Sequence, residues 1–138
     1  RRMGLIMLLA ILIGTVVAGY LKDYVVDRPR PDLEYLGSEL PMDVESDTTV
    51  LGGQGSFPSG HVTRASALAF VLGYALSDRF PRGWVLLWIF PGSMALSRIY
   101  LLQHHPMDVI GGVLFGIIIS AILANKLKLS EYLNSSKI

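Results

Sequence analysis

Residues 3–21 read MGLIMLLAILIGTVVAGYL, an apolar run that contains no charged side chain. A membrane-spanning helix needs about 20 predominantly apolar residues, whereas the apolar part of a secretory signal peptide is only about 7 to 15 residues long. The run therefore predicts a membrane span and not a signal peptide. Three further runs have similar character, so the sequence predicts four spans. They are Met3 to Leu21, Val62 to Ser77, Trp84 to Tyr100 and Met107 to Ala124.

The composition agrees with lipid as the solvent of this chain. Its 138 residues are 51% hydrophobic and 17% charged, with a mean hydropathy of +0.48, which is too apolar for an ordinary soluble domain. The chain has no cysteine, which excludes a disulfide framework and a thiol nucleophile. A net charge of +1 without a basic tract gives no indication of a nucleic-acid partner. We predict an all-α integral membrane bundle that forms one domain over residues 1–138.

The connections between the predicted spans differ in length and charge. Residues 22–58 form a long loop rich in acidic side chains, whereas the connections at 78–83 and 101–106 are short. Lys and Arg are enriched in cytoplasmic segments of membrane proteins, so their distribution puts the termini and residues 78–83 in the cytoplasm and the long loop outside. The cations on the predicted cytoplasmic face are Arg1, Arg2, Arg79, Arg82, Lys126, Lys128 and Lys137.

Two patterns inside the runs concern helix packing. Small residues recur at every fourth position in the second and fourth runs, a spacing that lets membrane helices approach closely within a bundle. Pro91 lies in the middle of the third run and predicts a kink there. The small residues are Ala65, Ala69, Gly73 and Ser77 in the second run and Gly112, Gly116 and Ser120 in the fourth.

Antiparallel threading of the spans brings several polar clusters to one membrane face, because alternate span ends meet there. Two imidazoles, a carboxylate and fixed cations are thereby gathered beside a helix N-terminus, whose free N–H groups and dipole favour an anion. The clusters are Lys22, Pro58-Ser59-Gly60-His61, Ser97-Arg98, and His104 with Asp108.

This set of side chains suits phosphoryl transfer, which needs a nucleophile, an acid for the leaving oxygen, and cations around the remaining oxygens. His104 and Asp108 are four residues apart, so a helix opened by Pro106 brings the carboxylate near the imidazole, where it can fix the tautomer. His61 is then available as the acid. A zinc site made of the His and Asp side chains is the competing interpretation. The zinc interpretation is opposed by nearby cations, which would repel a dication and attract a phosphate. These cations are Lys22, Arg30 and Arg98.

The same residues resemble the type 2 phosphatidic acid phosphatase superfamily, which includes lipid phosphate phosphatases and vanadium haloperoxidases. The family element Pro-Ser-Gly-His is complete at residues 58–61, and Ser-Arg-x5-His-x3-Asp is complete at residues 97–108. The family element Lys-x6-Arg-Pro is altered, because Lys22 is followed by Arg28-Pro29 after five residues and by Arg30-Pro31 after seven. We favour Arg30 as the family arginine and keep Arg28 as the second candidate. Membrane members of the family usually have six spans, of which four are visible here.

The resemblance implies a role for each matched residue. His104 attacks phosphorus to give a phosphohistidine, Asp108 orients His104 and stabilises its charge, and His61 protonates the leaving group. The non-bridging oxygens are held by side chains and a backbone N–H, without a metal or another cofactor. These phosphate-binding residues are Lys22, Arg30 or Arg28, Arg98, Ser59 and Gly60.

The sequence thus predicts a multi-pass membrane phosphatase with its active site on the extracytoplasmic side. Its expected substrate is a phosphate monoester or diphosphate of a lipid, such as phosphatidic acid, phosphatidylglycerophosphate or a polyprenyl diphosphate, because a site at the membrane surface meets substrates whose tails lie in the bilayer. The alternatives are a phosphatase of a soluble ester such as a sugar phosphate, and a catalytically silent lipid-binding scaffold. His105 has no place in the pattern and is interpreted as an interfacial neighbour.

Overall fold

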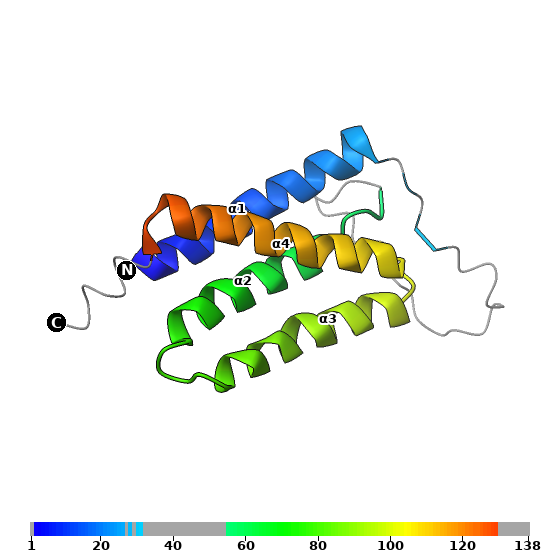
Figure 1. Ribbon diagram of the computed structural model, residues 1–138. Helices are drawn as coiled ribbons and strands as arrows, with labels where there is room; N and C mark the ends of the chain where they lie inside the picture. Colours follow the sequence, from blue (N-terminus) through cyan, green and yellow to red (C-terminus); the bar gives the residue numbers. More distant parts are fainter. Residues whose placement is uncertain (1, 27, 29, 32–54, 130–138) are drawn as a thin grey trace.

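The computed structural model describes residues 2–26, 28, 30–31 and 55–129 (Figure 1), and within them all regular structure is helical. Most of the long predicted loop, including all its acidic residues except Asp23, lies outside the described residues. All four apolar runs form helices, so the predicted all-α fold is confirmed. The elements are α1 (Arg2–Tyr20), η1 (Leu21–Val25), α2 (Gly60–Leu76), η3 (Gly83–Trp88), α3 (Ile89–Tyr100) and α4 (Pro106–Lys126).

The α2 helix is the centre of the bundle. It packs against α1, against α4, and against η3 with α3, and α1 also packs against α4. In Figure 1, α3 lies along one side of α2, and α4 lies along the other. The N-termini of α2 and α4 lie together, because the residue before α2 hydrogen-bonds to the first turn of α4. The polar residues before these two helices are therefore brought to the same end of the bundle.

Glycines of α4 let α2 approach to backbone contact. A Cβ atom on Gly112 would lie 2.7 Å from the carbonyl oxygen of Ser59, and one on Gly116 would lie 2.5 Å from that of Thr63. A side chain at either glycine would therefore push the two helices apart. Ser120, the third small residue, donates to a backbone carbonyl of α2 over 3.3 Å. The close packing predicted from the small residues of α4 is confirmed.

A buried apolar cluster lies at the opposite end of the bundle. Ile6 of α1, Val71 of α2, Ala124 of α4 and Leu129 pack together there. Lipid is as apolar as these side chains, so in a membrane the cluster stabilises the fold through close packing and not through removal from water. The cluster joins three helices at the end away from the polar residues.

Among the described residues, two helices are long and apolar enough to cross a membrane. They are Met3–Val25, in which α1 continues into η1, and Pro106–Lys126. With 17 and 12 residues, α2 and α3 are shorter than the roughly 20 residues of a usual span. The outer surfaces of the two long helices carry rows of exposed apolar side chains at helical spacing, as a bundle embedded in lipid requires. These are Leu5, Leu8, Leu12 and Val16 on α1, and Ile110, Leu114, Ile118 and Ile122 on α4.

The third predicted span is not a single α-helix. Residues 83–88 form the 3₁₀ helix η3, and α3 begins at Ile89, so Pro91 lies in the first turn of α3. Proline lacks an N–H group and clashes with the carbonyl four residues earlier, so it is tolerated in the first turn of an α-helix but not in its interior. The predicted mid-span kink is therefore wrong, and a change of helix type takes its place.

Candidate functional site

The two ends of the long loop meet beside the end of α1. The π-helical turn η1 carries Lys22, and a Cβ atom on Gly55 would lie only 2.9 Å from the carbonyl oxygen of that lysine. Glycine therefore allows the chain that returns toward α2 to pass directly over the turn. Next to it, the N–H of Ser56 donates to the carbonyl of Arg28 over 2.8 Å. These contacts bring the segment before α2 to the basic residues that follow α1.

The Pro58-Ser59-Gly60-His61 segment is fastened directly to α4. The N–H of Ser59 donates to the carbonyl of Asp108 over 2.9 Å, and α2 begins at the next residue. Ser59 is fully buried, and its hydroxyl has no hydrogen-bond partner among the described residues. His61, the second residue of α2, is half-buried. The segment thus presents a helix N-terminus together with a buried hydroxyl, an arrangement suited to an anion.

An aromatic contact of Phe57 also holds this segment against α4. The ring of Phe57 lies against Gly111, where any Cβ atom would overlap the ring. The ring also packs edge-on against Phe115 of α4, with 6.3 Å between the centroids. The segment before α2 is therefore positioned by α4 through both its backbone and its side chains.

His104 lies in the short connection between α3 and α4 and is only 4% exposed. Its Nδ1 is 2.8 Å from the carbonyl oxygen of Ser56. A carbonyl oxygen can only accept, so Nδ1 carries the proton and donates it, and Nε2 keeps its lone pair. The contact between the segment before α2 and the segment before α4 therefore decides which nitrogen of His104 can react.

Burial and nearby positive charge keep His104 neutral. Burial has the largest effect and the charge of Lys22 the second largest, and the net result lowers the pKa of His104 from 6.5 to about 4. Arg30 lowers this pKa further, whereas the bond to Ser56 and the charge of Asp108 oppose the shift. At neutral pH the imidazole is thus uncharged although cations lie near it.

Asp108 is buried in the first turn of α4 and is held by groups other than the imidazole. Its Oδ2 accepts the N–H of His105 over 2.7 Å and lies 3.9 Å from Nδ1 of His104. Its Oδ1 lies 3.3 Å from Nη1 of Arg28, an ion pair without the alignment of a hydrogen bond. The carboxylate is near the imidazole, as the spacing predicts, but it does not fix the tautomer. The carbonyl of Ser56 does so, and Asp108 acts on the ring through its charge.

Arg98 is positioned by the loop that leads to His104. Its carbonyl accepts the N–H groups of Gln103 and His104 over 3.1 and 3.3 Å, and its Nη1 donates to Oε1 of Gln103. Leu102, with φ of 53°, turns the loop back on the end of α3. Nε of Arg98 is buried and has no hydrogen-bond partner among the described residues. A buried cationic N–H of this kind is suited to bind an anionic oxygen.

The structure distinguishes the two candidate arginines. Arg28 pairs with Asp108, whereas the charge of Arg30 acts on His104 together with that of Lys22. A turn closed by i→i+5 bonds, such as η1, holds about one residue more than an α-helical turn. The interval from the lysine to Arg30 is longer than the family pattern by one residue. Arg30 as the family arginine stays a prediction.

The described part of the chain brings the predicted residues together at one end of the bundle, and it adds one that the sequence did not indicate. Ser56 contributes its carbonyl to His104, and its own hydroxyl is buried without a partner among the described residues. A backbone acceptor leaves no signal in a side-chain pattern, so no motif could have identified it. Within the described residues no group of three or more His, Cys, Asp or Glu that could hold a metal ion is present.

These features define a class of helical membrane protein with a cationic, histidine-containing site where its helix ends meet. Within that class, the chain belongs to the PAP2 superfamily, which matches residues 3–130. The family predicted from the three sequence elements is therefore confirmed.

The relatives of the chain include phosphatases of several lipids. It is 34% identical over 118 residues to sphingosine-1-phosphate phosphatase 2 of Homo sapiens, covering 83% of this chain and 26% of the relative. It is 31% identical over 123 residues to phosphatidylglycerophosphatase B of Bacillus subtilis, covering 84% and 54%. It is 36% identical over 99 residues to decaprenylphosphoryl-5-phosphoribose phosphatase of Mycobacterium tuberculosis, covering 72% and 48%. The chain thus spans between about a quarter and about half of the length of these relatives. No solved structure matches the chain.

Proposed function

We propose that this chain carries the catalytic centre of a metal-independent phosphatase, which hydrolyses a phosphate monoester or diphosphate of a lipid through a phosphohistidine intermediate. The observation that carries the proposal is the state of His104. Its Nδ1–H is bonded to the carbonyl of Ser56, so Nε2 has the lone pair, and the low pKa keeps the ring neutral. A neutral imidazole beside cations suits a nucleophile that attacks an anionic phosphate.

In the first half-reaction, Nε2 of His104 attacks phosphorus and forms a P–N bond. The bond from phosphorus to the leaving oxygen breaks, and its electron pair stays on the leaving oxygen. That oxygen then receives a proton from His61. The phosphorylated imidazole gains positive charge during this step. The carboxylate of Asp108, 3.9 Å from Nδ1, stabilises that charge.

In the second half-reaction, a water molecule replaces the departed alcohol or phosphate. His61, which has just lost its proton, removes one from the water, and the water oxygen attacks phosphorus. The P–N bond breaks, its electrons return to Nε2 of His104, and inorganic phosphate leaves. The two imidazoles thus recover their starting protonation states.

The non-bridging oxygens of the phosphate are bound by the positive and N–H groups around His104. Arg98 supplies the buried Nε–H that has no partner among the described residues, and the hydroxyl of Ser59 is buried in the same way. Lys22 and Arg30 supply positive charge that already acts on the imidazole. The N–H of Gly60, at the start of α2, completes the set. Arg28 supports the site indirectly, through its ion pair with Asp108.

A lipid substrate is supported by the position of these residues and by the relatives. The site lies at the ends of apolar helices, where a headgroup at the membrane surface can enter while the lipid tail stays in the bilayer. Sphingosine-1-phosphate, phosphatidylglycerophosphate and decaprenylphosphoryl-5-phosphoribose appear in the names of similar proteins. The proposal therefore includes a multi-pass topology with the site on the extracytoplasmic side.

The catalytic proposal is tested with purified protein in detergent that contains a metal chelator. We expect phosphate release from at least one of phosphatidic acid, phosphatidylglycerophosphate and a polyprenyl diphosphate, with inhibition by vanadate. His104→Ala should lower this rate by about 10⁴-fold or more, because the nucleophile is lost. His105→Ala is the matched control on the same loop, and its rate should stay within a few-fold of the native chain.

A trapping experiment tests the intermediate itself. With p-nitrophenyl phosphate, whose leaving group needs little protonation, His61→Asn should still form the phosphohistidine but hydrolyse it slowly. The phosphoenzyme should then accumulate and be stable in base and labile in acid.

Undiminished turnover in His104→Ala refutes the assignment of His104 as the nucleophile. Activity that is lost with chelator and restored by zinc favours a metal site, turnover of a sugar phosphate alone favours a soluble ester, and lipid binding without any turnover favours a scaffold.

The topology is tested by cysteine labelling, since the native chain has no cysteine to contribute background. Arg82→Cys lies in the exposed turn between α2 and η3, and Asp23→Cys is exposed beside the phosphate site. In intact cells, a membrane-impermeant maleimide should label Asp23→Cys and spare Arg82→Cys until the cells are opened. The reverse pattern contradicts the extracytoplasmic site.

A further inference from the structure

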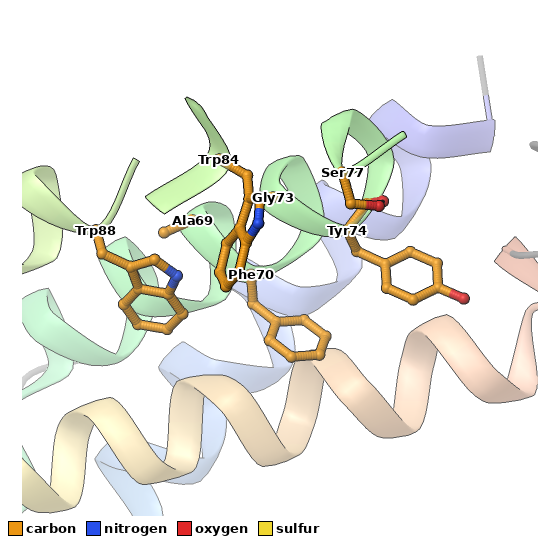
Figure 2. A pocket seen from close by; sticks show the side chains of 7 residues that line it. All are labelled: Ala69, Phe70, Gly73, Tyr74, Ser77, Trp84 and Trp88. Carbon is orange, nitrogen blue, oxygen red and sulfur yellow. The ribbon is translucent and has the colours of Figure 1, made fainter. Parts of the chain in front are cut away.

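An apolar pocket lies between the second half of α2 and the 3₁₀ helix η3, away from the phosphate site (Figure 2). Its volume is about 220 Å³. Ala69, Phe70 and Gly73 of α2 line one side, and the two indole rings of Trp84 and Trp88 line the other. Trp84 packs close to Gly73, since a Cβ atom on that glycine would lie 3.5 Å from its indole ring, and the pocket lies beside this contact.

The lining of this pocket is almost wholly apolar, and cationic residues follow it along the chain. Ala69 and Phe70 lie nearer the start of α2, and Tyr74 and Ser77 lie nearer its end (Figure 2). The Ser77 hydroxyl donates to the carbonyl of Tyr74 over 2.9 Å. The turn that follows carries Arg79 and Arg82, which are both exposed. Positions 69 and 77 lie about 13 and 25 Å along the α2 axis from its first residue, at 1.5 Å per residue. The pocket therefore lies in the leaflet opposite the phosphate site.

We propose that this pocket binds one acyl chain of an anionic phospholipid in that opposite leaflet, with the lipid phosphate held by Arg79 and Arg82. An apolar pocket followed along the chain by two exposed arginines matches the order of acyl chain and phosphate in a phospholipid. Tyr and Trp are suited to this depth, because their rings accept the chain while their polar atoms reach the interface.

The size and position of the pocket narrow the choice of ligand further. Pockets that enclose a whole small molecule measure about 300–1,000 Å³, so 220 Å³ suits one flexible chain whose headgroup remains outside. Arg binds phosphate through two parallel N–H groups, and cations near an anionic leaflet attract its lipids. A lipid whose phosphate lies beside Arg79 is about 25 Å from the start of α2, so it is not the substrate of the proposed reaction.

The chain provides its own probe of this pocket, since Trp84 and Trp88 are its only two tryptophans. The full chain is reconstituted in phosphatidylcholine vesicles that contain increasing fractions of phosphatidylglycerol with brominated chains, which quench tryptophan on contact. Brominated phosphatidylcholine serves as the uncharged comparison. We expect phosphatidylglycerol to quench at lower mole fraction, with a preference of roughly fivefold for each arginine that contacts the phosphate.

Substitutions distinguish lipid bound in the pocket from bulk lipid around the protein. Gly73→Leu should fill the pocket and remove the preference, whereas Gly73→Ala should keep it, because the added Cβ lies 3.5 Å from Trp84, an ordinary contact. The double variant Arg79→Gln, Arg82→Gln should reduce the preference without filling the pocket. Lys126→Gln is its control, an exposed cation at the same end of the bundle. His104→Ala should bind the lipid like the native chain, so the result is independent of the proposed catalysis.

Two results overturn the proposal. Equal quenching by both lipids at every mole fraction shows that only bulk lipid reaches the tryptophans. Absence of quenching by either lipid shows that protein covers the pocket, either a second copy or another segment. If Gly73→Leu fails to fold, the exposed arginine variants decide the question alone.

Discussion

The two halves of α2 meet their neighbours in different ways. The first half approaches α4 until backbone touches backbone, with glycines at 112 and 116 and a direct hydrogen bond from Ser59 to Asp108. The second half is separated from η3 by two indole rings and leaves a pocket of about 220 Å³. Backbone contact leaves no room for adjustment, whereas side-chain contact does. The packing of α2 is therefore most tightly constrained near the histidines, where it faces α4, and less constrained where it faces η3.

The largest expected effect comes from the charges within the tight half. Asp108→Asn should lower the turnover of lipid phosphate by about 10³-fold, because the charge that stabilises the phosphorylated imidazole is lost. Arg28→Gln should lower it less. The effects of these two substitutions should not add, since the side chains form an ion pair at 3.3 Å.

Arg30→Gln provides the matched comparison for Arg28→Gln. We expect its effect to add to that of Asp108→Asn within about 0.5 kcal/mol, because the ion pair with Asp108 belongs to Arg28. Turnover is measured for the single and double variants with the same lipid. Coupling of Asp108 to Arg30 and not to Arg28 would exchange the roles assigned to the two arginines.

The comparison between the halves is tested most directly by the same substitution at a contact of each half, at Gly116 of α4, which faces the first half of α2, and at Gly73 in the second half. Gly116→Ala places a methyl group 2.5 Å from the Thr63 carbonyl, and we expect a loss of about 1–3 kcal/mol in unfolding free energy. Gly73→Ala meets only an ordinary contact of 3.5 Å and should be neutral or stabilising by up to about 1 kcal/mol, since Ala favours a helix. Unfolding in detergent measures both.

Gly92→Ala is the control for these two variants. It lies in the first half of α3, where an added Cβ meets nothing within 4 Å. Its unfolding free energy should resemble that of Gly73→Ala. Equal destabilisation by Gly116→Ala and Gly73→Ala contradicts the idea that one half of α2 is held more tightly than the other.

The smallest expected effect is a shift in pH dependence. His104 must be neutral to attack phosphorus, and its pKa is lowered from 6.5 to about 4, so the acid limb of kcat/KM from this group should lie near pH 4. Lys22→Met removes a charge that lowers this pKa, so the limb should move to higher pH. The total rate also falls, because Lys22 binds phosphate, but the position of the limb is the informative quantity.

Lys126→Met controls for a general change in charge and should leave the acid limb of kcat/KM in place.

The lowered pKa of His104 also has a consequence for stability. Between about pH 6.5 and pH 4 the unfolded chain binds a proton on His104 that the folded chain does not, so the unfolding free energy falls as the pH is lowered through this window. An acid limb near pH 6.5 in the native chain contradicts a buried neutral His104.

The sequence predicts the helices and the side chains proposed for the site. The features that escape prediction depend on the path of the backbone and not on the side-chain pattern. Apolar runs and spaced motifs are properties of side chains, so the four helices and the residues from Lys22 to Asp108 could be identified. The acceptor for His104 is the backbone of Ser56, which any residue provides. Pro91 was recognised as a disruption, but whether it ends or bends a helix depends on where the helix begins. The ion pair of Arg28 with Asp108 joins residues far apart in the sequence, so spacing alone could not predict it.

The bond from the Ser59 N–H to the Asp108 carbonyl has a mechanical consequence. Membranes differ in thickness, and helices respond to thickness by tilting. Because this bond and the glycine contacts behind it join α2 to α4, we expect the two helices to tilt together and to keep the distance between their first turns. We therefore expect phosphate chemistry at these first turns to proceed at similar rates in thin and thick bilayers, whereas the side of α2 that faces η3 yields to lateral pressure.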